Sequence, residues 1–174
     1  MMSRRGLFCL LLIGVIWLFC FPALLRAASQ EESEQWLAAH NRYRGLHGVS
    51  PLVWSERIAA SALAYAETCP SGHSATGYGE NLSWASYGMG VTAVVTKWYD
   101  EQSLYDYANP RFITGTGHFT QIIWKGTVSV GCARVTGCGP EHSLNANTWV
   151  CQYDPPGNYI SQFSQNVFPP LLEK

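Results

Sequence analysis

The chain has 174 residues, of which 47% are hydrophobic, 13% aromatic and only 13% charged. This length and composition suit one compact domain and exclude an intrinsically disordered chain. The formal net charge is −1 and the sequence has no basic run, so nucleic acid is excluded as an expected partner.

Residues 1–28 have the layout of a secretory signal peptide. Arg4 and Arg5 precede a long apolar run, and the small residues Ala27 and Ala28 mark the expected cleavage site. The apolar run is longer than in most signal peptides, so an uncleaved membrane anchor is the alternative. Both interpretations place residues 29–174, the expected single domain, outside the cytosol.

The compartment decides how the cysteines are interpreted. Four of them follow the leader, Cys69, Cys132, Cys138 and Cys151, and in an oxidising space they predict two disulfides with three connectivities. Cys132 and Cys138 lie on one expected strand and its turn, which a bridge between them would pinch. We therefore favour the pairs Cys132–Cys151 and Cys69–Cys138. A zinc site is the other interpretation, but no CxxC spacing is present.

The domain begins with two predicted helices. The first covers residues 31–46, with acidic residues at its start and basic residues near its end, as the helix dipole favours. The second covers residues 55–67, with Ser55 as N-cap and apolar residues repeating on one face. A glycine-rich loop at 71–79 follows and holds His73.

Residues 80–84 are expected to form a short buried strand or an extended turn. Asn81-Leu82-Ser83 is a glycosylation sequon, which makes Asn81 a candidate glycan site. A glycan requires exposure, and the apolar neighbours Leu82 and Trp84 argue against it.

The spacing of apolar residues predicts a third helix after residue 90. Val91, Val94 and Trp98 lie on a core-facing stripe, and Glu101 is the next position on it. A carboxylate buried there needs a partner, because burying it alone costs several kcal/mol. The alternative is that the helix has reached solvent by Glu101.

The segment GHFTQIIW, residues 117–124, predicts a short helix after a loop at 105–112. His118 shares a face of this helix with Ile122. An imidazole in such a place is either a satisfied core histidine or a site residue.

Two strands are predicted in the last third of the chain. Residues 128–135 alternate as a strand would, and residues 148–153 form the answering strand, between a polar turn region and a Pro-Pro-Gly-Asn turn. We expect them to pair antiparallel, which would bring Cys132 near Cys151.

Four segments occur in order at familiar distances: HNRYR (40–44), GENLSW (79–84), GHFTQIIW (117–124) and CQYDPPGNYI (151–160). Together they resemble the CAP superfamily, named for cysteine-rich secretory proteins, antigen 5 and pathogenesis-related class 1 proteins, over about residues 30–168. The resemblance implies an α+β fold, a three-layer α/β/α sandwich with a small, mainly antiparallel sheet. The two favoured disulfides match the remaining pairs of the family.

The resemblance also implies a cleft with two histidines and two acidic residues, at His73, Glu80, Glu101 and His118. Two neutral imidazoles can ligate a divalent cation such as Zn or Mg, while carboxylates neutralise it or orient water. Without a third firm ligand the site would be weak, and it would lose the cation as the histidines protonate below about pH 6.5. The alternative is that the His–Glu pairs only fix loop positions.

The loop from Tyr105 to Phe112 is the second candidate surface. Tyr105, Tyr107 and Phe112 resemble the aromatic loop of secreted fungal members, which looks like their sterol-binding segment. Flat rings on a mobile loop could cover a rigid apolar ligand; the alternative is that they anchor the loop to the core. Plant-type members usually carry an extra cysteine pair here, and residues 105–116 contain none, so we expect an untethered loop.

The sequence is thus identified as a secreted, monomeric CAP domain that binds a sterol or related small lipid for export or sequestration. It is not expected to be an enzyme, and its cleft would hold a divalent cation. One alternative is a defence or virulence effector that contacts a host or cell-surface protein. Another is a metal-dependent hydrolase, although the sequence has neither an HExxH helix nor an evident nucleophile with a paired base.

Overall fold

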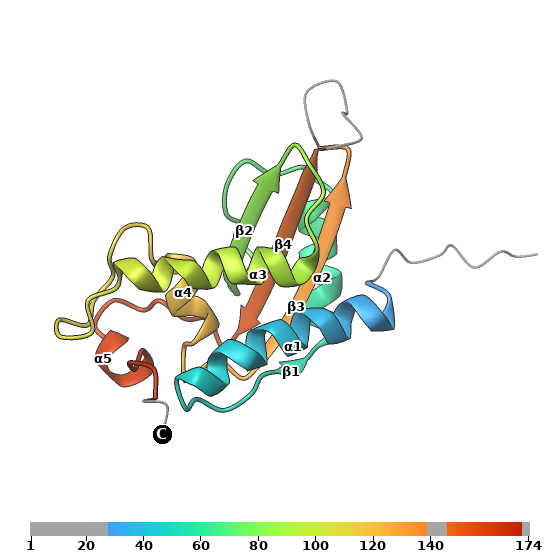
Figure 1. Ribbon diagram of the computed structural model, residues 1–174. Helices are drawn as coiled ribbons and strands as arrows, with labels where there is room; N and C mark the ends of the chain where they lie inside the picture. Colours follow the sequence, from blue (N-terminus) through green and yellow to red (C-terminus); the bar gives the residue numbers. More distant parts are fainter. Residues whose placement is uncertain (1–27, 139–145, 172–174) are drawn as a thin grey trace, which may run out of the picture.

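The computed structural model describes residues 28–138 and 146–171 (Figure 1). The predicted leader, except Ala28, lies outside the described residues, so neither its cleavage nor its retention as an anchor is tested. Within the described part of the chain, no helix is long and apolar enough to cross a membrane.

A four-stranded sheet forms the middle layer of the molecule. Its strands are β1 (Val53–Trp54), β2 (Gly79–Ala85), β3 (Ser129–Thr136) and β4 (Asn147–Asp154), in the spatial order β1-β3-β4-β2. β4 pairs antiparallel with both β2 and β3, whereas the short β1 runs parallel to β3. The sheet is therefore mainly antiparallel, as the sequence predicted.

Helices cover both faces of the sheet (Figure 1). The helices α1 (Gln30–Leu46) and α3 (Val91–Tyr99) lie over one face, and α2 (Glu56–Ala66) lies over the other. Three shorter helices complete the chain: the 3-10 helix η1 (Asp100–Leu104), α4 (Gly117–Ile122) and α5 (Phe163–Asn166). The predicted α/β/α sandwich is confirmed.

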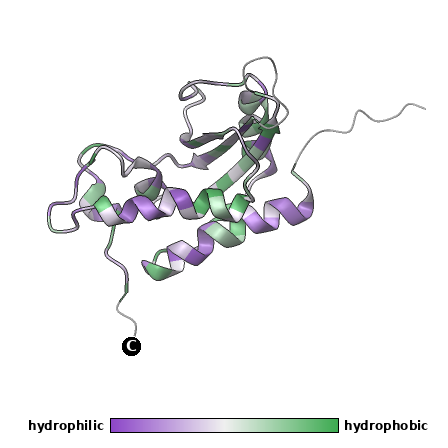
Figure 2. Cartoon of the chain, turned by 45° about the horizontal axis from the view of Figure 1, so that its top comes forward, coloured by the Kyte–Doolittle hydropathy of each residue, from purple (hydrophilic) through white to green (hydrophobic). Residues whose placement is uncertain are grey.

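Side-chain caps explain where the first two helices begin. The Ser29 hydroxyl accepts a hydrogen bond from the N–H of Glu32, and the Ser55 hydroxyl accepts one from Ile58. The first turns of α1 are hydrophilic (Figure 2), so only part of this helix packs on the sheet. The predicted N-cap at Ser55 is confirmed.

Arg44 is fully buried at the end of α1 and holds several chain segments together. Its guanidinium donates hydrogen bonds to the carbonyl oxygens of Ser50, Ile122, Trp124 and Thr127. Burial lowers the pKa of Arg44 to about 10, which leaves it charged at neutral pH. Because Ile122 ends α4, this arginine fixes the helix that carries His118.

The disulfides are Cys69–Cys138 and Cys132–Cys151, as predicted. Cys132 and Cys151 are register partners on β3 and β4, so their bond crosses the middle of the sheet. Cys69 lies just after α2, so its bond with Cys138 ties the end of that helix to the segment after β3. Two disulfides indicate an oxidising compartment.

Candidate functional site

Glu101 and His118 form the first half of the candidate site. Glu101 accepts hydrogen bonds from His118 Nδ1 at 2.6 Å, from the His118 N–H at 2.9 Å and from the Phe119 N–H at 3.2 Å. The residue that precedes α4, Thr116, gives no side-chain cap, so Glu101 caps this helix from a distant part of the chain. The partner that Glu101 was expected to need is therefore His118.

The His118 ring lies at the edge of a cleft of about 340 Å³. It stacks on Trp98, with ring centroids 5.8 Å apart, and Trp98 in turn donates to the Leu82 carbonyl. Because Nδ1 donates to Glu101, the Nε2 atom of the neutral ring keeps its lone pair. The residues that line the cleft are Leu82, Ser83, Trp84, Lys97, Trp98, Glu101 and His118.

His73 and Glu80 form a second, separate pair. His73 Nδ1 lies 3.0 Å from Glu80 Oε1, and Glu80 also accepts hydrogen bonds from Ser74 and Gln152. Burial raises the pKa of Glu80, but the hydrogen bonds from His73, Ser74 and Gln152 outweigh it and leave that pKa below its ordinary value. The hydrogen bond to Glu80 raises the pKa of His73.

Glu80 and its neighbour Asn81 belong to opposite faces of β2. Side chains alternate along β2, so Glu80 points to the face of its partner Gln152, whereas Asn81 points to the opposite face and donates to the His118 carbonyl. Among the described residues, no three of the four predicted ligands have donor atoms within 4.8 Å of one another. Each predicted histidine is thus paired with one of the predicted glutamates, and a cation site shared by all four side chains stays a prediction.

One other group of potential ligands is compact, namely His40 with Cys132 and Cys151, whose donor atoms lie within 4.8 Å of one another. The two sulfur atoms are bonded to each other and are therefore not thiolates. Both ring nitrogens of His40 are also hydrogen-bonded, to the Trp36 carbonyl at 2.7 Å and the Tyr153 hydroxyl at 2.8 Å. This group is a structural cluster and not a metal centre.

A buried chain of hydrogen bonds leads from α1 to the cleft. His40 contacts the Tyr153 hydroxyl, Asn81 Nδ2 lies 3.1 Å from the same hydroxyl, and Asn81 Nδ2 donates to the His118 carbonyl at 3.1 Å. Sequence reasoning used His40 and Tyr153 only as parts of motifs, considered Asn81 as a glycan site, and missed the role of all three. Each of the three residues lies inside one of the four motifs that carry the family resemblance, and this placement was the signal that could have identified them.

Comparison with known proteins decides the family. The model of the cysteine-rich secretory protein family, CAP, matches residues 37–153. The chain belongs to the CAP family.

The relatives of this CAP chain include plant and fungal proteins. Pathogenesis-related protein 1 of Arabidopsis thaliana is 38% identical over 144 residues, which cover 80% of this chain and 86% of that protein. Protein PRY2 of Saccharomyces cerevisiae is 42% identical and Repressed by EFG1 protein 1 of Candida albicans is 41% identical, over 75% and 83% of this chain. The chain spans only 39% and 56% of those two fungal proteins, respectively.

Solved structures agree with the fold. The structure of BmVAL-1 has a TM-score of 0.67 at 23% identity, over 76% of this chain and 81% of that one. The crystal structure of NaASP2 with Zn²⁺ has a TM-score of 0.64 at 23% identity, over 83% of this chain and 88% of that one. Similarity at this identity supports the fold alone.

In this CAP domain the aromatic loop is anchored on one side. Tyr105 is buried, with its ring 5.7 Å from Phe119, and the half-buried Tyr107 packs edge-on against Tyr105 at 5.1 Å. No disulfide tethers the loop, but two of its three predicted lipid contacts, Tyr105 and Tyr107, pack against the core. Phe112 is 52% exposed and alone of the three offers much surface to a ligand.

Asn81, the candidate glycan site, is 1% exposed. Its Nδ2 atom, to which a glycan would be attached, already makes hydrogen bonds to His118 and Tyr153. A glycan would replace both bonds and open the core, so the structure argues against glycosylation here.

Proposed function

We propose that this chain is a secreted CAP-domain protein that binds a sterol or a related small lipid for sequestration or export. The observation that carries the proposal is a group of exposed apolar side chains, which we name the apolar rim. It consists of Leu104, Phe112, Tyr159 and Ile160, with exposed fractions of 62%, 52%, 50% and 85%. Side chains of this size are rarely left in water as a group unless they meet an apolar partner.

The rim belongs to segments that meet beside α4. The Phe112 ring lies against Gly117, and the side chain of Asn158, the residue before Tyr159, donates to the Gly117 carbonyl at 2.9 Å. Leu104 lies against Gly115, two residues before Gly117. A flat apolar ligand laid on Phe112 would therefore also be within reach of the segment with Ile160, and buried area would supply its affinity.

A divalent cation is proposed as a second, weak ligand. The donor set fits such an ion, because His73 and His118 each donate Nδ1–H to a glutamate and keep Nε2 as a ligand atom. A bound Zn²⁺ or Mg²⁺ would supply positive charge beside the cleft. The raised pKa of His73 means that protons would compete with the ion from a higher pH than at an ordinary histidine.

We propose a binding role and not catalysis. Nδ1 of His118 is hydrogen-bonded to Glu101. Among the described residues, no hydroxyl or thiol that could act as a nucleophile is hydrogen-bonded to the His118 ring. We also propose that the domain acts as a monomer.

The test is uptake of radiolabelled cholesterol by the protein secreted from the full-length chain, with and without EDTA. Replacement Phe112→Ser removes the exposed ring and is expected to weaken saturable binding about tenfold, because most of the lost contact area is apolar. Tyr87→Ser is the matched control, since Tyr87 is an exposed aromatic residue that is not part of the rim. It should bind like the wild type.

Two results would overturn the lipid proposal: no saturable uptake by the wild type, or equal binding by the Phe112 and Tyr87 variants. Loss of binding in EDTA would show that the cation supports the lipid site. Undiminished binding in EDTA would leave the lipid proposal standing and show that lipid binding does not need the cation.

A further inference from the structure

The outer edge of β3 is open over most of its length. β1 pairs only with Ser129 and Val130, and the N–H of Ser55 donates to the Val130 carbonyl at 2.9 Å. Backbone groups alternate along a strand, so the N–H and C=O groups of Arg134 and Thr136 point to the same side as those of Val130. Within residues 28–138 and 146–171 these outward groups have no backbone hydrogen-bond partner.

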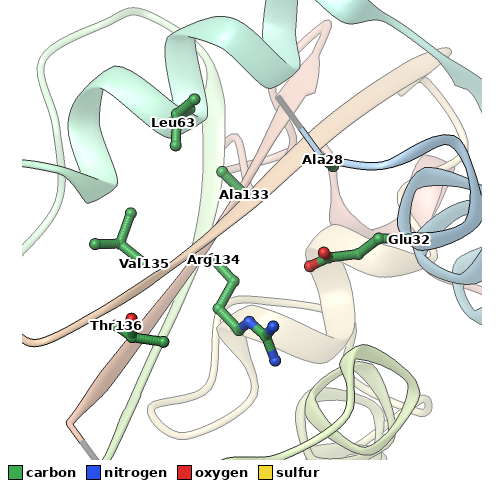
Figure 3. A pocket seen from close by; sticks show the side chains of 7 residues that line it. All are labelled: Ala28, Glu32, Leu63, Ala133, Arg134, Val135 and Thr136. Carbon is green, nitrogen blue, oxygen red and sulfur yellow. The ribbon is translucent and has the colours of Figure 1, made fainter. Parts of the chain in front are cut away.

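A pocket of about 230 Å³ follows this open edge (Figure 3). On the α2 side of the sheet it is lined by Leu63, Ala133 and Val135, and on the other side by Arg134 and Glu32 (Figure 3). The remaining lining residues are Ala28 and Thr136. The edge therefore combines free backbone groups with an apolar wall on one face and a pair of charges on the other.

We propose that this edge binds an extended segment of a partner protein, which adds to the sheet as a further strand beside β3. Unpaired N–H and C=O groups on an exposed edge are a template for such addition. The outward backbone groups would give the added strand its affinity, and the side chains on either face would select its sequence.

Charge decides which segment fits. Arg134 is exposed and makes no hydrogen bond or ion pair with any described residue. Glu32, on the same side of the pocket, is too far from its guanidinium to form an ion pair. An acidic side chain on the added strand would meet Arg134, and a basic one two positions along the same face would approach Glu32. The residue between them faces Leu63 and is apolar. The preferred pattern is acidic, apolar, basic.

A second copy of this chain is a poorer occupant. If two β3 edges paired antiparallel, the registers that use the outward groups of Arg134 and Thr136 would place Arg134 either directly opposite its own equivalent or diagonal to it on the same face. Like charges opposite each other on neighbouring strands are destabilising. The edge is therefore assigned to a different protein.

The probe is the synthetic peptide Ac-TVEVKVT-NH2, titrated into the ¹⁵N-labelled protein secreted from the full-length chain. Binding should shift the amide signals of Arg134 and Thr136 and slow their hydrogen exchange, because these N–H groups gain carbonyl partners. The peptide Ac-TV-(N-methyl-Glu)-(N-methyl-Val)-KVT-NH2 has the same charges but lacks two adjacent N–H groups, one of which must point to β3 in either strand direction, so it should bind weakly or not at all.

A charge swap tests the role of Arg134. Arg134→Glu should weaken binding of Ac-TVEVKVT-NH2 about tenfold and strengthen binding of Ac-TVKVKVT-NH2. Arg42→Glu, at an exposed position of α1 that does not line the pocket, is the matched control and should leave both affinities unchanged. The swap in preference distinguishes a specific contact from partial unfolding, which would weaken both peptides.

Several outcomes overturn the proposal. They are no binding of the first peptide at 1 mM (on the order of the weakest specific peptide affinities), equal binding of the N-methylated peptide, or identical behaviour of the two arginine variants. Self-association in sedimentation experiments that Thr136→Pro abolishes would also overturn it, because the occupant would then be a second copy.

Discussion

His40 is a titratable side chain buried in the core of this CAP domain. It is fully buried, and hydrogen bonds to the Trp36 carbonyl and the Tyr153 hydroxyl occupy both ring nitrogens. Burial, with a smaller contribution from the charge of Arg44, lowers the pKa of His40 to about 4, although its bond to the Trp36 carbonyl acts in the opposite direction. The ring is therefore neutral at neutral pH, and the hydrogen-bond chain to Asn81 requires that neutral form.

This pKa predicts a loss of stability in mild acid. As pH falls from 6.5, the unfolded chain takes up a proton at His40 that the folded chain refuses until about pH 4. The free energy of unfolding should fall by about 3 kcal/mol over that range from this residue alone. Burial also lowers the pKa of His47, which adds a loss of the same sign.

Urea unfolding at pH 7, 5.5 and 4 measures the effect. His40→Gln should be less stable than the wild type at pH 7 but should lose less stability on acidification. His73→Gln is the control with the opposite sign, because its raised pKa gives stability that is present below pH 6.5 and lost as pH rises through the folded value. Equal slopes for the wild type and His40→Gln would contradict the assignment.

Helices and strands that depend on short-range sequence patterns could be predicted from the sequence. The apolar stripe of α3, the Ser55 cap, the alternation of β3 and the turn residues that bound β4 are local signals, and the structure has each of these elements within one or two residues of its prediction. Pairing β3 with β4 then brought Cys132 to Cys151. The brief helix α5 carries only one helical turn and has too short a pattern to be detected.

The site could be predicted only in part, for physical reasons. Glu101 lies on η1, and the partner that its carboxylate needs is 17 positions away, which no local pattern specifies. The direction in which the Glu80 side chain points depends on whether residues 80–84 form a strand or a turn. Composition does not decide between the two. For Tyr105 and Phe112 the sequence cannot separate an anchoring ring from an exposed one, since both are aromatic residues near a proline.

The contact between α2 and β3 yields a second prediction. A Cβ atom at Gly131 would lie 2.1 Å from the backbone nitrogen of Ala59, so the first turn of α2 packs directly on the backbone of β3. Gly131→Ala should cost about 3 kcal/mol or more, because the clash is with backbone that cannot move alone. Thermal unfolding measures the loss.

Gly45→Ala is the control for this prediction. Gly45 lies in α1 with nothing within 4 Å of its added Cβ atom, so alanine there should stabilise the domain by about 0.5–1 kcal/mol. A Gly131→Ala variant as stable as Gly45→Ala would show that α2 does not rest on the strand in solution.

The whole molecule is closed by two disulfides whose roles differ. Cys69–Cys138 joins positions 69 residues apart and Cys132–Cys151 joins positions 19 apart. Chain entropy alone would assign them about 4 and 3 kcal/mol, respectively. Cys132 and Cys151 are buried, however, whereas Cys69 is exposed, so removing the shorter bridge also removes core packing.

The variant Cys132→Ala/Cys151→Ala should therefore be less stable than the variant Cys69→Ala/Cys138→Ala. Loop length alone predicts the opposite order of stability. The comparison is with Cys69→Ala/Cys138→Ala in urea at neutral pH. If the Cys69/Cys138 variant proves less stable, loop closure outweighs burial in this fold.

The Glu101 carboxylate holds the His118 ring and also the first N–H groups of α4. A related protein whose cleft had lost its function would still need this glutamate, because it holds the His118 ring and the start of α4 in place. Finding the pair in another member of the family is therefore a sign of common ancestry and of a chain that folds. Only a direct measurement separates an active site from an inherited scaffold.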